Sequence, residues 1–187
     1  MNQAAQPGCA ASSPAADDPV AARLAGTELP GLAFDAATGR RIHLRDLAAG
    51  TLILYVYPRT GRPGAPDPPG WDAIPGTRGC TAQACAFRDL SPQFSTVGAR
   101  IAGLSAQTAR YQREAASRLR LPFPLLADPE LRLAAALGLP TFCAGKLRLY
   151  RRLTLIARAG IIVKVFYPVS RPERNADAVL AWLKGMA

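Results

Sequence analysis

TLILYVY, residues 51–57, is the stretch that decides the fold of this chain. It is an unbroken apolar run rich in β-branched and aromatic residues, which predicts a central β-strand buried on both faces. Pro58 follows and ends the strand, because proline has no N–H to donate to a neighbouring strand. Residues 99–105, ARIAGLS, predict a second buried strand of the same kind. Strands like these need helices on both faces of their sheet.

The flanking segments predict further strands towards both ends of the chain. Residues 29–47, LPGLAFDAATGRRIHLRDL, contain two short alternating runs around Gly39, the pattern of an N-terminal β-hairpin. Residues 152–168, RLTLIARAGIIVKVFYP, form two apolar runs joined at Ala159 and Gly160, and predict two more strands.

Apolar residues at helical spacing predict four helices in other parts of the sequence. A helix is expected from about Cys80 onward, an arginine-rich surface helix over residues 108–120, and a closing amphipathic helix over residues 176–187. After a short strand, Asp128 as cap and Pro129 at the first helical position predict another helix, which Gly138 and Pro140 stop. This order predicts an α/β fold of the thioredoxin-like type, with a mixed central sheet and helices on both faces.

One segment fits no regular element. Residues 58–76 contain six prolines and four glycines, which predicts a long loop without a packed element of its own. We expect residues 59–76 to be mobile and to modulate access to a site rather than its chemistry.

Length and composition indicate one globular domain. The chain has 187 residues, of which 49% are hydrophobic, so we expect a single domain over residues 26–187 after a disordered leader over residues 1–25. The leader has neither the basic nor the apolar region of a secretory signal, and no apolar run approaches the roughly 18 residues of a membrane span. We therefore expect a cytoplasmic protein that is not integral to a membrane.

The net charge of +10 raises the question of nucleic-acid binding. Residues 100–187 carry the whole excess, with 15 basic and 5 acidic side chains. The excess is dispersed, without a run of like charges or a binding motif. No nucleic-acid partner is therefore expected.

Four cysteines, Cys9, Cys80, Cys85 and Cys143, carry the remaining chemical signal. Only Cys80 and Cys85 are close, as C-x4-C, which is neither the C-x-x-C of a thioredoxin-type redox site nor half of a zinc site. His43 is the only histidine and lies in a half-exposed strand pattern, so a Cys–His dyad is not expected.

Cys80 follows a buried strand and a loop, in the first turn of the next predicted helix. Free N–H groups at the amino end of a helix favour a thiolate over a thiol. Thr77 is the candidate cap, and its hydroxyl can donate to and accept from groups around the sulfur. The alternative is that Cys80 is a small apolar core residue and Thr77 only a cap.

The segment PGTRGCTAQACAFRD, residues 75–89, resembles the active-site segment of peroxiredoxins of the Q type, also called bacterioferritin comigratory protein-like. Its motif is T-x-x-C with a second cysteine five residues on. The resemblance continues in LPGLAFDAATGRRIHLRDL, LPFPLLADPELRLAAALG and RRLTLIARAGIIVKVFYP, and so spans about residues 26–187.

The resemblance implies a role for each matched residue. Cys80 matches the peroxidatic cysteine, Cys85 the resolving cysteine in the same helix, and Thr77 the signature threonine. Arg152 matches the arginine that opens the penultimate strand and points at the peroxidatic sulfur.

The neighbouring Arg151 is the competing candidate for that arginine. We choose Arg152 because it lies two positions before Thr154, on the same face of the strand. Gln83 falls where the family often has Glu or Gln, three residues after the peroxidatic cysteine.

One position departs from the family pattern. The signature proline normally lies four residues before the threonine, where this chain has Ala73, whereas Pro58 lies 19 residues before Thr77. The proline- and glycine-rich stretch thus behaves as an insertion of about 15 residues beside the active site. The insertion leaves open whether Pro58 still shields the thiolate.

The function implied by the resemblance is that of a thiol-dependent peroxidase without metal or organic cofactor. Its substrates are hydrogen peroxide and organic hydroperoxides, Cys80 and Cys85 form an intramolecular disulfide, and a thioredoxin-like donor reduces it. A monomer is expected, with a dimer as the alternative.

The alternative functions on the same fold are a thiol–disulfide oxidoreductase, a non-enzymatic redox sensor and a basic binding module. Cys143 is expected to be a partly buried free cysteine, with a resolving role as the alternative, and Cys9 to be incidental.

Overall fold

The computed structural model describes residues 19–186. The strands are β1 (Ala33–Ala36), β2 (Arg41–His43), β3 (Thr51–Val56), β4 (Ala99–Ser105), β5 (Leu125–Ala127), β6 (Thr141–Ala144), β7 (Leu147–Tyr150), β8 (Leu153–Arg158) and β9 (Ile161–Phe166). The α-helices are α1 (Val20–Leu24), α2 (Leu44–Leu47), α3 (Cys80–Asp89), α4 (Ser91–Thr96), α5 (Ala109–Arg118), α6 (Arg132–Leu137) and α7 (Asn175–Lys184). Two short 3₁₀ helices complete the structure, η1 (Trp71–Ala73) and η2 (Pro172–Arg174).

Seven strands form one mixed sheet in the order β2-β1-β5-β4-β3-β8-β9. β5, β4 and β3 are parallel neighbours, and the outer pairings are antiparallel. β1 and β2 form the expected N-terminal hairpin, and β8 and β9 form the expected C-terminal one. The predicted α/β fold is therefore confirmed.

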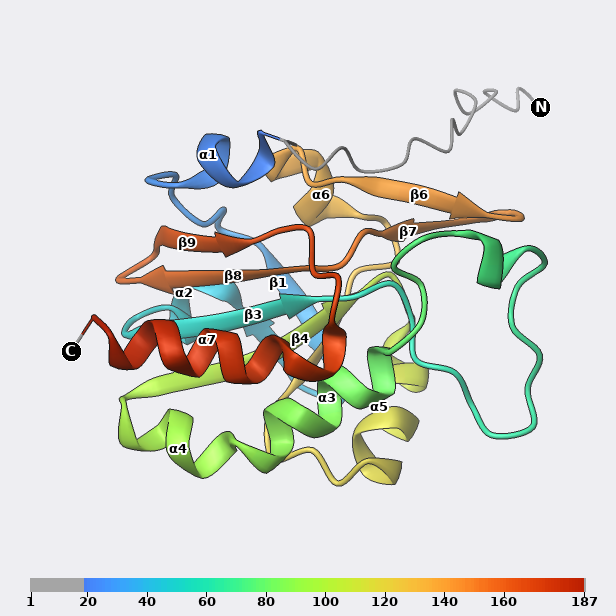
Figure 1. Cartoon of the computed structure of the whole chain (residues 1–187), viewed down its shortest axis with the longest axis horizontal. Helices are drawn as coiled ribbons and strands as arrows, with labels where there is room; N and C mark the ends of the chain where they lie inside the picture. The colour runs from blue at the N-terminus through green and yellow to red at the C-terminus, as the bar shows by residue number, and fades with distance from the viewer. Residues whose placement is uncertain (1–18, 187) are drawn as a thin grey trace.

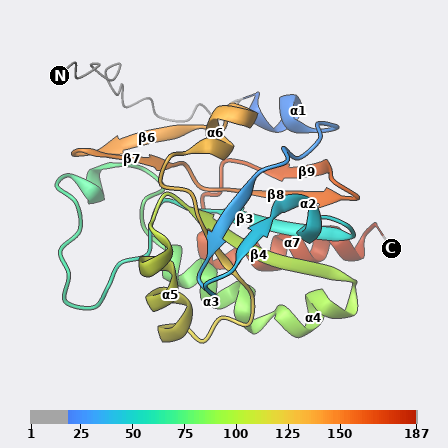
Figure 2. The same ribbon diagram turned by 180° about the vertical axis from the view of Figure 1, so that it is seen from behind.

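Alternation along β3 separates the two cores of the molecule. Its Leu52, Leu54 and Val56 face the cluster that includes α1, α2 and α6. Ile53 and Tyr55 face the opposite cluster, with α3, α4, α5 and α7 (Figures 1 and 2). The Tyr55 ring stacks on Phe87 of α3 with ring centroids 4.8 Å apart. This contact helps to fix α3, which carries both active-site cysteine candidates, on the sheet.

The leader expected over residues 1–25 includes a helix. Residues 1–18 lie outside the described part of the chain, but residues 20–24 form α1, whose Val20 and Leu24 are buried in the core. The prediction of disorder is wrong for α1, because these two side chains give the segment an apolar face to bury.

The hairpin of β6 and β7 was not predicted. β6 and β7 pair antiparallel as a separate two-stranded sheet. Their buried Phe142, Ala144 and Leu149 pack with Trp71 of η1. The prediction that the insertion has no packed element is thus wrong, because Trp71, 5% exposed, joins this third cluster.

The helix after Asp128 begins later than expected, at Arg132 instead of Pro129. The Asp128 carboxylate still accepts hydrogen bonds from the backbone N–H groups of Arg132 (3.0 Å) and Leu133 (2.9 Å). It also accepts one from the Tyr150 hydroxyl at 2.6 Å, so Asp128 links α6 to the β6–β7 hairpin.

Across residues 19–186, no helix has both the length and the apolar character that a membrane crossing requires.

Gly103, in the middle of β4, gives a test of this packing. A Cβ at Gly103 would lie 2.6 Å from both Leu125 Cδ2 and Tyr55 Cζ. We expect Gly103→Ala to destabilise the fold by about 1–3 kcal/mol, as overpacked core positions do. Thermal unfolding is the measurement, with Gly50→Ala as the control, because a Cβ at Gly50 meets no atom within 4 Å. Equal unfolding midpoints for the two variants would contradict the packing described here.

Candidate active site

Cys80 is the first residue of α3 and is 4% exposed. Gly79 precedes it with φ of 93°, a conformation that favours glycine. A Cβ on Gly79 would also lie 2.9 Å from Pro172 Cγ. The start of the helix at Cys80 is thus determined by Gly79.

Thr77 does not cap α3 as predicted, since no side chain caps this helix. Its buried hydroxyl lies within hydrogen-bond distance of the carbonyl oxygens of Trp71 (2.8 Å) and Ile74 (2.9 Å). Cys80 Sγ instead lies 3.6 Å from the Thr77 carbonyl oxygen. The Thr77 side chain therefore connects the active-site turn to the insertion.

Arg152, directly before β8, brings a guanidinium to the sulfur. Its Nη2 lies 3.1 Å from Cys80 Sγ, and its Nη1 donates to Gln83 Oε1 at 2.5 Å. Nη2 also lies near the three carbonyl oxygens of the preceding turn, those of Gly76 (3.2 Å), Thr77 (3.4 Å) and Arg78 (2.9 Å). The Arg151 guanidinium lies elsewhere, 5.4 Å from the ring centroid of Phe142. The structure thus brings Cys80, Arg152 and Gln83 together and leaves Arg151 outside.

The charge of Arg152 is not cancelled by a carboxylate. Its side chain is 3% exposed, and no ion pair involves it among residues 19–186. A desolvated cation this close to a sulfur stabilises negative charge on it. Beneath α3, burial raises the pKa of both Tyr55 and Tyr57, so their hydroxyls stay neutral. The arrangement places a buried positive charge without a carboxylate partner next to the Cys80 sulfur.

Cys80 opens onto a surface cleft of about 560 Å³. One side of the cleft is the active-site turn and the start of α3, including Thr77, Arg78 and Cys80. The other side comes from the insertion and includes Arg59, Arg62, Asp67 and Trp71. Residues 19–186 hold no cluster of side chains suited to a metal ion. The site is thus a thiol beside a guanidinium, in a cleft large enough for a small substrate.

Residues 24–180 match the family model described as Redoxin. The chain belongs to the Redoxin family. It is 28% identical over 148 residues to the chloroplastic peroxiredoxin Q of Sedum lineare, covering 79% of this chain and 71% of that protein. It is 27% identical over 159 residues to the Arabidopsis thaliana peroxiredoxin Q, covering 85% of this chain and 66% of that protein.

Similar solved structures agree with this assignment. Peroxidoxin BcpB from Mycobacterium tuberculosis superposes with a TM-score of 0.72 at 27% identity, covering 87% of this chain and 97% of that one. A peroxiredoxin Q from Xanthomonas campestris gives a TM-score of 0.70 at 28% identity, covering 88% of this chain and 99% of that one. The chain is thus a peroxiredoxin of the Q type and a thiol peroxidase.

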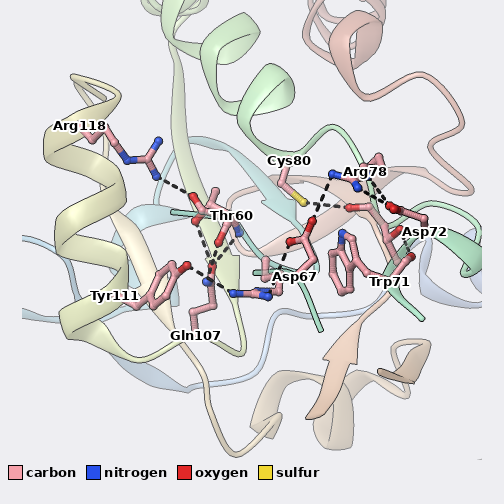
Figure 3. A network of polar contacts seen from close by, with 12 residues as sticks. Thr60, Asp67, Trp71, Asp72, Arg78, Cys80, Gln107, Tyr111 and Arg118 are labelled. Atoms are coloured by element: carbon pink, nitrogen blue, oxygen red, sulfur yellow. Dashed lines mark hydrogen bonds and ion pairs between the residues drawn. The ribbon is translucent and has the colours of Figure 1, made fainter. Parts of the chain in front are cut away.

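The insertion of this peroxiredoxin is attached to the domain near both of its ends (Figure 3). At its start, the Thr60 N–H donates to Gln107 Oε1 at 2.9 Å, and Gln107 Nε2 donates back to the Thr60 carbonyl at 3.0 Å. At its end, Arg78 forms ion pairs with Asp67 at 3.2 Å and with Asp72. Arg78 is two residues before Cys80, so the insertion contacts the active-site turn directly.

Pro58 does not contribute to the cleft. It is buried at the end of β3, and the described residues that line the cleft do not include it. Trp71 and Asp67 of the insertion lie there instead. The insertion, not the proline, forms the wall that faces Cys80.

The other cysteines differ in their availability. Cys85 is a free, half-buried thiol one and a half turns along α3 from Cys80. Cys143 on β6 is disulfide-bonded, so the prediction of a free cysteine is wrong. His43 is exposed on β2, as its sequence pattern indicated.

Sequence reasoning gave no role to Asn175. The segment RPERNADAV places an asparagine before an amphipathic run, and that pattern indicates only a helix cap. In the structure Asn175 is the first residue of α7, is 4% exposed, and accepts a hydrogen bond from Gln83 Nε2 at 2.9 Å. No local pattern reveals this contact, because the two residues are 92 positions apart.

The two neighbouring arginines provide a matched test of the site. We expect Arg152→Ala to slow oxidation of Cys80 by hydrogen peroxide at least about tenfold, equivalent to about 1.4 kcal/mol in the barrier. Loss of the guanidinium removes the charge that stabilises the thiolate. Arg151→Ala should change the rate by less than about threefold, because that side chain stacks on Phe142. Stopped-flow measurement of the peroxide step compares them, and a reversed ranking would assign the site to the other arginine.

Proposed function

We propose that this peroxiredoxin reduces hydrogen peroxide and organic hydroperoxides through Cys80, with Cys85 as the resolving residue. One observation carries the proposal, the 3.1 Å approach of Arg152 Nη2 to Cys80 Sγ beside an open cleft. A cation at that distance prepares the sulfur for nucleophilic attack. A solved neighbour from Xanthomonas campestris, a bacterioferritin comigratory protein, is described by its alkyl peroxide reduction activity, which supports organic hydroperoxides as substrates.

In the first step the Cys80 thiolate attacks the terminal oxygen of ROOH. The S–O bond forms as the O–O bond breaks, the sulfur loses two electrons, and the alkoxide takes a proton and leaves as ROH. Hydrogen-bond donors aimed at the departing oxygen stabilise its developing charge. Arg152 Nε is buried without a hydrogen-bond partner among the described residues, which supports a role for this side chain in binding the peroxide oxygens. Thr77 is the other side chain that we assign to peroxide binding. Its hydroxyl proton is directed at the carbonyl oxygens of Trp71 and Ile74, so its oxygen serves as an acceptor for a peroxide O–H.

In the second step the Cys85 thiol attacks the Cys80 sulfenic acid. A disulfide forms and the sulfenic oxygen leaves as water. A dithiol donor of the thioredoxin type then reduces the disulfide by thiol–disulfide exchange and returns both cysteines to the thiol state. The cycle requires no metal or organic cofactor.

The second step requires a change in α3. Residues five apart in a regular helix have Cα atoms roughly 8–9 Å apart, whereas a disulfide tolerates at most about 7 Å. Because α3 runs unbroken over Cys80–Asp89, the disulfide cannot form until its first turns unwind. Unwinding also breaks the contact of Gln83 with Arg152, so it removes part of the peroxide-reactive arrangement.

Serine substitutions separate the two cysteine roles. We expect Cys80→Ser to abolish peroxide reduction, because the nucleophile is lost. Cys85→Ser should keep the first oxidation and lose recycling by thioredoxin, because no disulfide forms. Peroxide consumption in a thioredoxin-coupled assay, with sulfenic acid trapping by dimedone, measures both. Full turnover by Cys80→Ser would refute the assignment.

The unwinding of α3 gives a second test. We expect the disulfide form to lose about one to two turns of helix and to exchange amide hydrogens faster over residues 81–88, without global unfolding. Hydrogen exchange followed by mass spectrometry compares the reduced and oxidised proteins, with residues 109–118 of α5 as an internal control. Identical protection of residues 81–88 in both forms would point to a resolving thiol outside this helix.

A further inference from the structure

Behind Arg152 lies a continuous row of buried polar side chains. Gln83 Oε1 accepts from Arg152 Nη1 at 2.5 Å, and Gln83 Nε2 donates to Asn175 Oδ1 at 2.9 Å. The Thr154 hydroxyl donates to the same Asn175 oxygen at 2.7 Å. All four side chains are between 0% and 4% exposed. The row joins β8, α3 and α7 directly behind the reactive sulfur.

The hydrogen bonds of this row are consistent in only one orientation. The Arg152 guanidinium can only donate, so the group facing its Nη1 must be the oxygen of the Gln83 amide. The Gln83 NH₂ then points the other way and needs an acceptor. Asn175 Oδ1 is that acceptor. The Thr154 hydroxyl donates to the second lone pair of the same oxygen. A flipped Gln83 would place NH₂ against guanidinium, two donors facing each other in a buried place.

We propose that Asn175 is a positioning residue for the reaction of Cys80. It fixes the amide of Gln83, and Gln83 in turn fixes the guanidinium of Arg152 against the sulfur. The inference rests on the proposed role of Cys80 as the peroxide nucleophile. Thr154 fixes Asn175 in the same way, from the strand that follows Arg152.

The row is also electrically neutral apart from Arg152. Gln83, Asn175 and Thr154 satisfy its hydrogen bonds without supplying a negative charge, so the guanidinium keeps its full charge for Cys80. A carboxylate in the place of an amide would partly neutralise that charge. The proposed role is therefore orientation of Arg152 without neutralisation.

A second contact places the same C-terminal segment at Cys80. Pro172 of η2 lies close to Gly79. A Cβ added to Gly79 would lie 2.9 Å from Pro172 Cγ. Three residues later, Asn175 reaches Gln83, three residues after Cys80. The segment thus contacts one residue before Cys80, Gly79, and one residue after it, Gln83. The hydrogen-bond contacts of Cys80 Sγ are with Arg152 and the Thr77 carbonyl, so this segment bears on the position of Cys80 and not on the sulfur directly.

Substitution of Asn175 tests the inference. Asn175→Leu keeps the shape but removes the acceptor, and should slow both the peroxide oxidation and the iodoacetamide alkylation of Cys80 about tenfold. Asn175→Asp keeps an acceptor oxygen for Gln83 and Thr154 but adds a negative charge near Arg152, so both rates should lie between those of Asn175→Leu and the parent protein. Both rates are measured on protein whose helix content and unfolding midpoint are also recorded. Equal rates for the parent and a folded Asn175→Leu protein would overturn the proposal.

A double-mutant cycle separates positioning from a general structural effect. If Asn175 acts through Gln83, adding Asn175→Leu to Gln83→Leu should slow Cys80 no further. If the double variant is slowed by the product of the two single-variant effects, Asn175 acts by a route other than Gln83. If Asn175→Leu does not fold, Thr154→Val against Thr154→Ser gives the same comparison, with a slower Cys80 expected only for valine. Equal rates in that pair would overturn the proposal too.

Alkylation distinguishes this inference from the proposed function. If the parent protein does not react with peroxide but Asn175→Leu still slows alkylation, the peroxidase proposal fails and the positioning role stands. If the parent reacts with peroxide and neither rate responds to Asn175→Leu, the peroxidase proposal stands and the positioning role fails.

Discussion

The contact between the Arg152 guanidinium and the Cys80 sulfur is the constraint on which the active site depends. A cation that is 3% exposed is costly to bury unless its N–H groups are hydrogen-bonded. The turn before α3 meets this requirement for Arg152 Nη2 by directing the carbonyls of residues 76–78 towards it. Gly76 and Gly79, with φ of 82° and 93°, lie at the two ends of this turn. The sequence GTRG thus shapes an acceptor site for the arginine as well as the start of the helix.

Residues 59–76 give this peroxiredoxin one wall of its active-site cleft. Trp71 packs against the β6–β7 hairpin, while Asp67 and Asp72 pair with Arg78 of the active-site turn. Exposed ion pairs contribute little individually, so the buried Trp71 and the hydroxyl of Thr77 are the stronger attachments. A substrate that enters the cleft therefore meets arginine, aspartate and tryptophan side chains from the insertion.

The regular parts of the molecule were predictable because their patterns are local. The unbroken apolar run of β3, the turn at Ala159 and Gly160, and the start of α3 at Cys80 all follow from neighbouring residues. The contacts made by Trp71 and Asn175 were not, because each depends on a partner far away in the chain. The packing of the insertion was not predictable either, since many prolines and glycines indicate a loop but do not reveal that one tryptophan packs against an apolar cluster. Thr77 was predicted to cap α3, but Gly79 occupies the N-cap position and the Thr77 hydroxyl is directed at the carbonyls of Trp71 and Ile74.

The chemistry of the first turnover tests the central claim most directly. Fully reduced protein is mixed with one equivalent of hydrogen peroxide, quenched with a thiol-alkylating reagent within seconds, and digested for mass spectrometry. The account predicts that the peroxide is consumed and that Cys80 and Cys85 are recovered in one disulfide-linked peptide. Unconsumed peroxide with Cys80 still open to alkylation would contradict the account, as would oxidation confined to other residues.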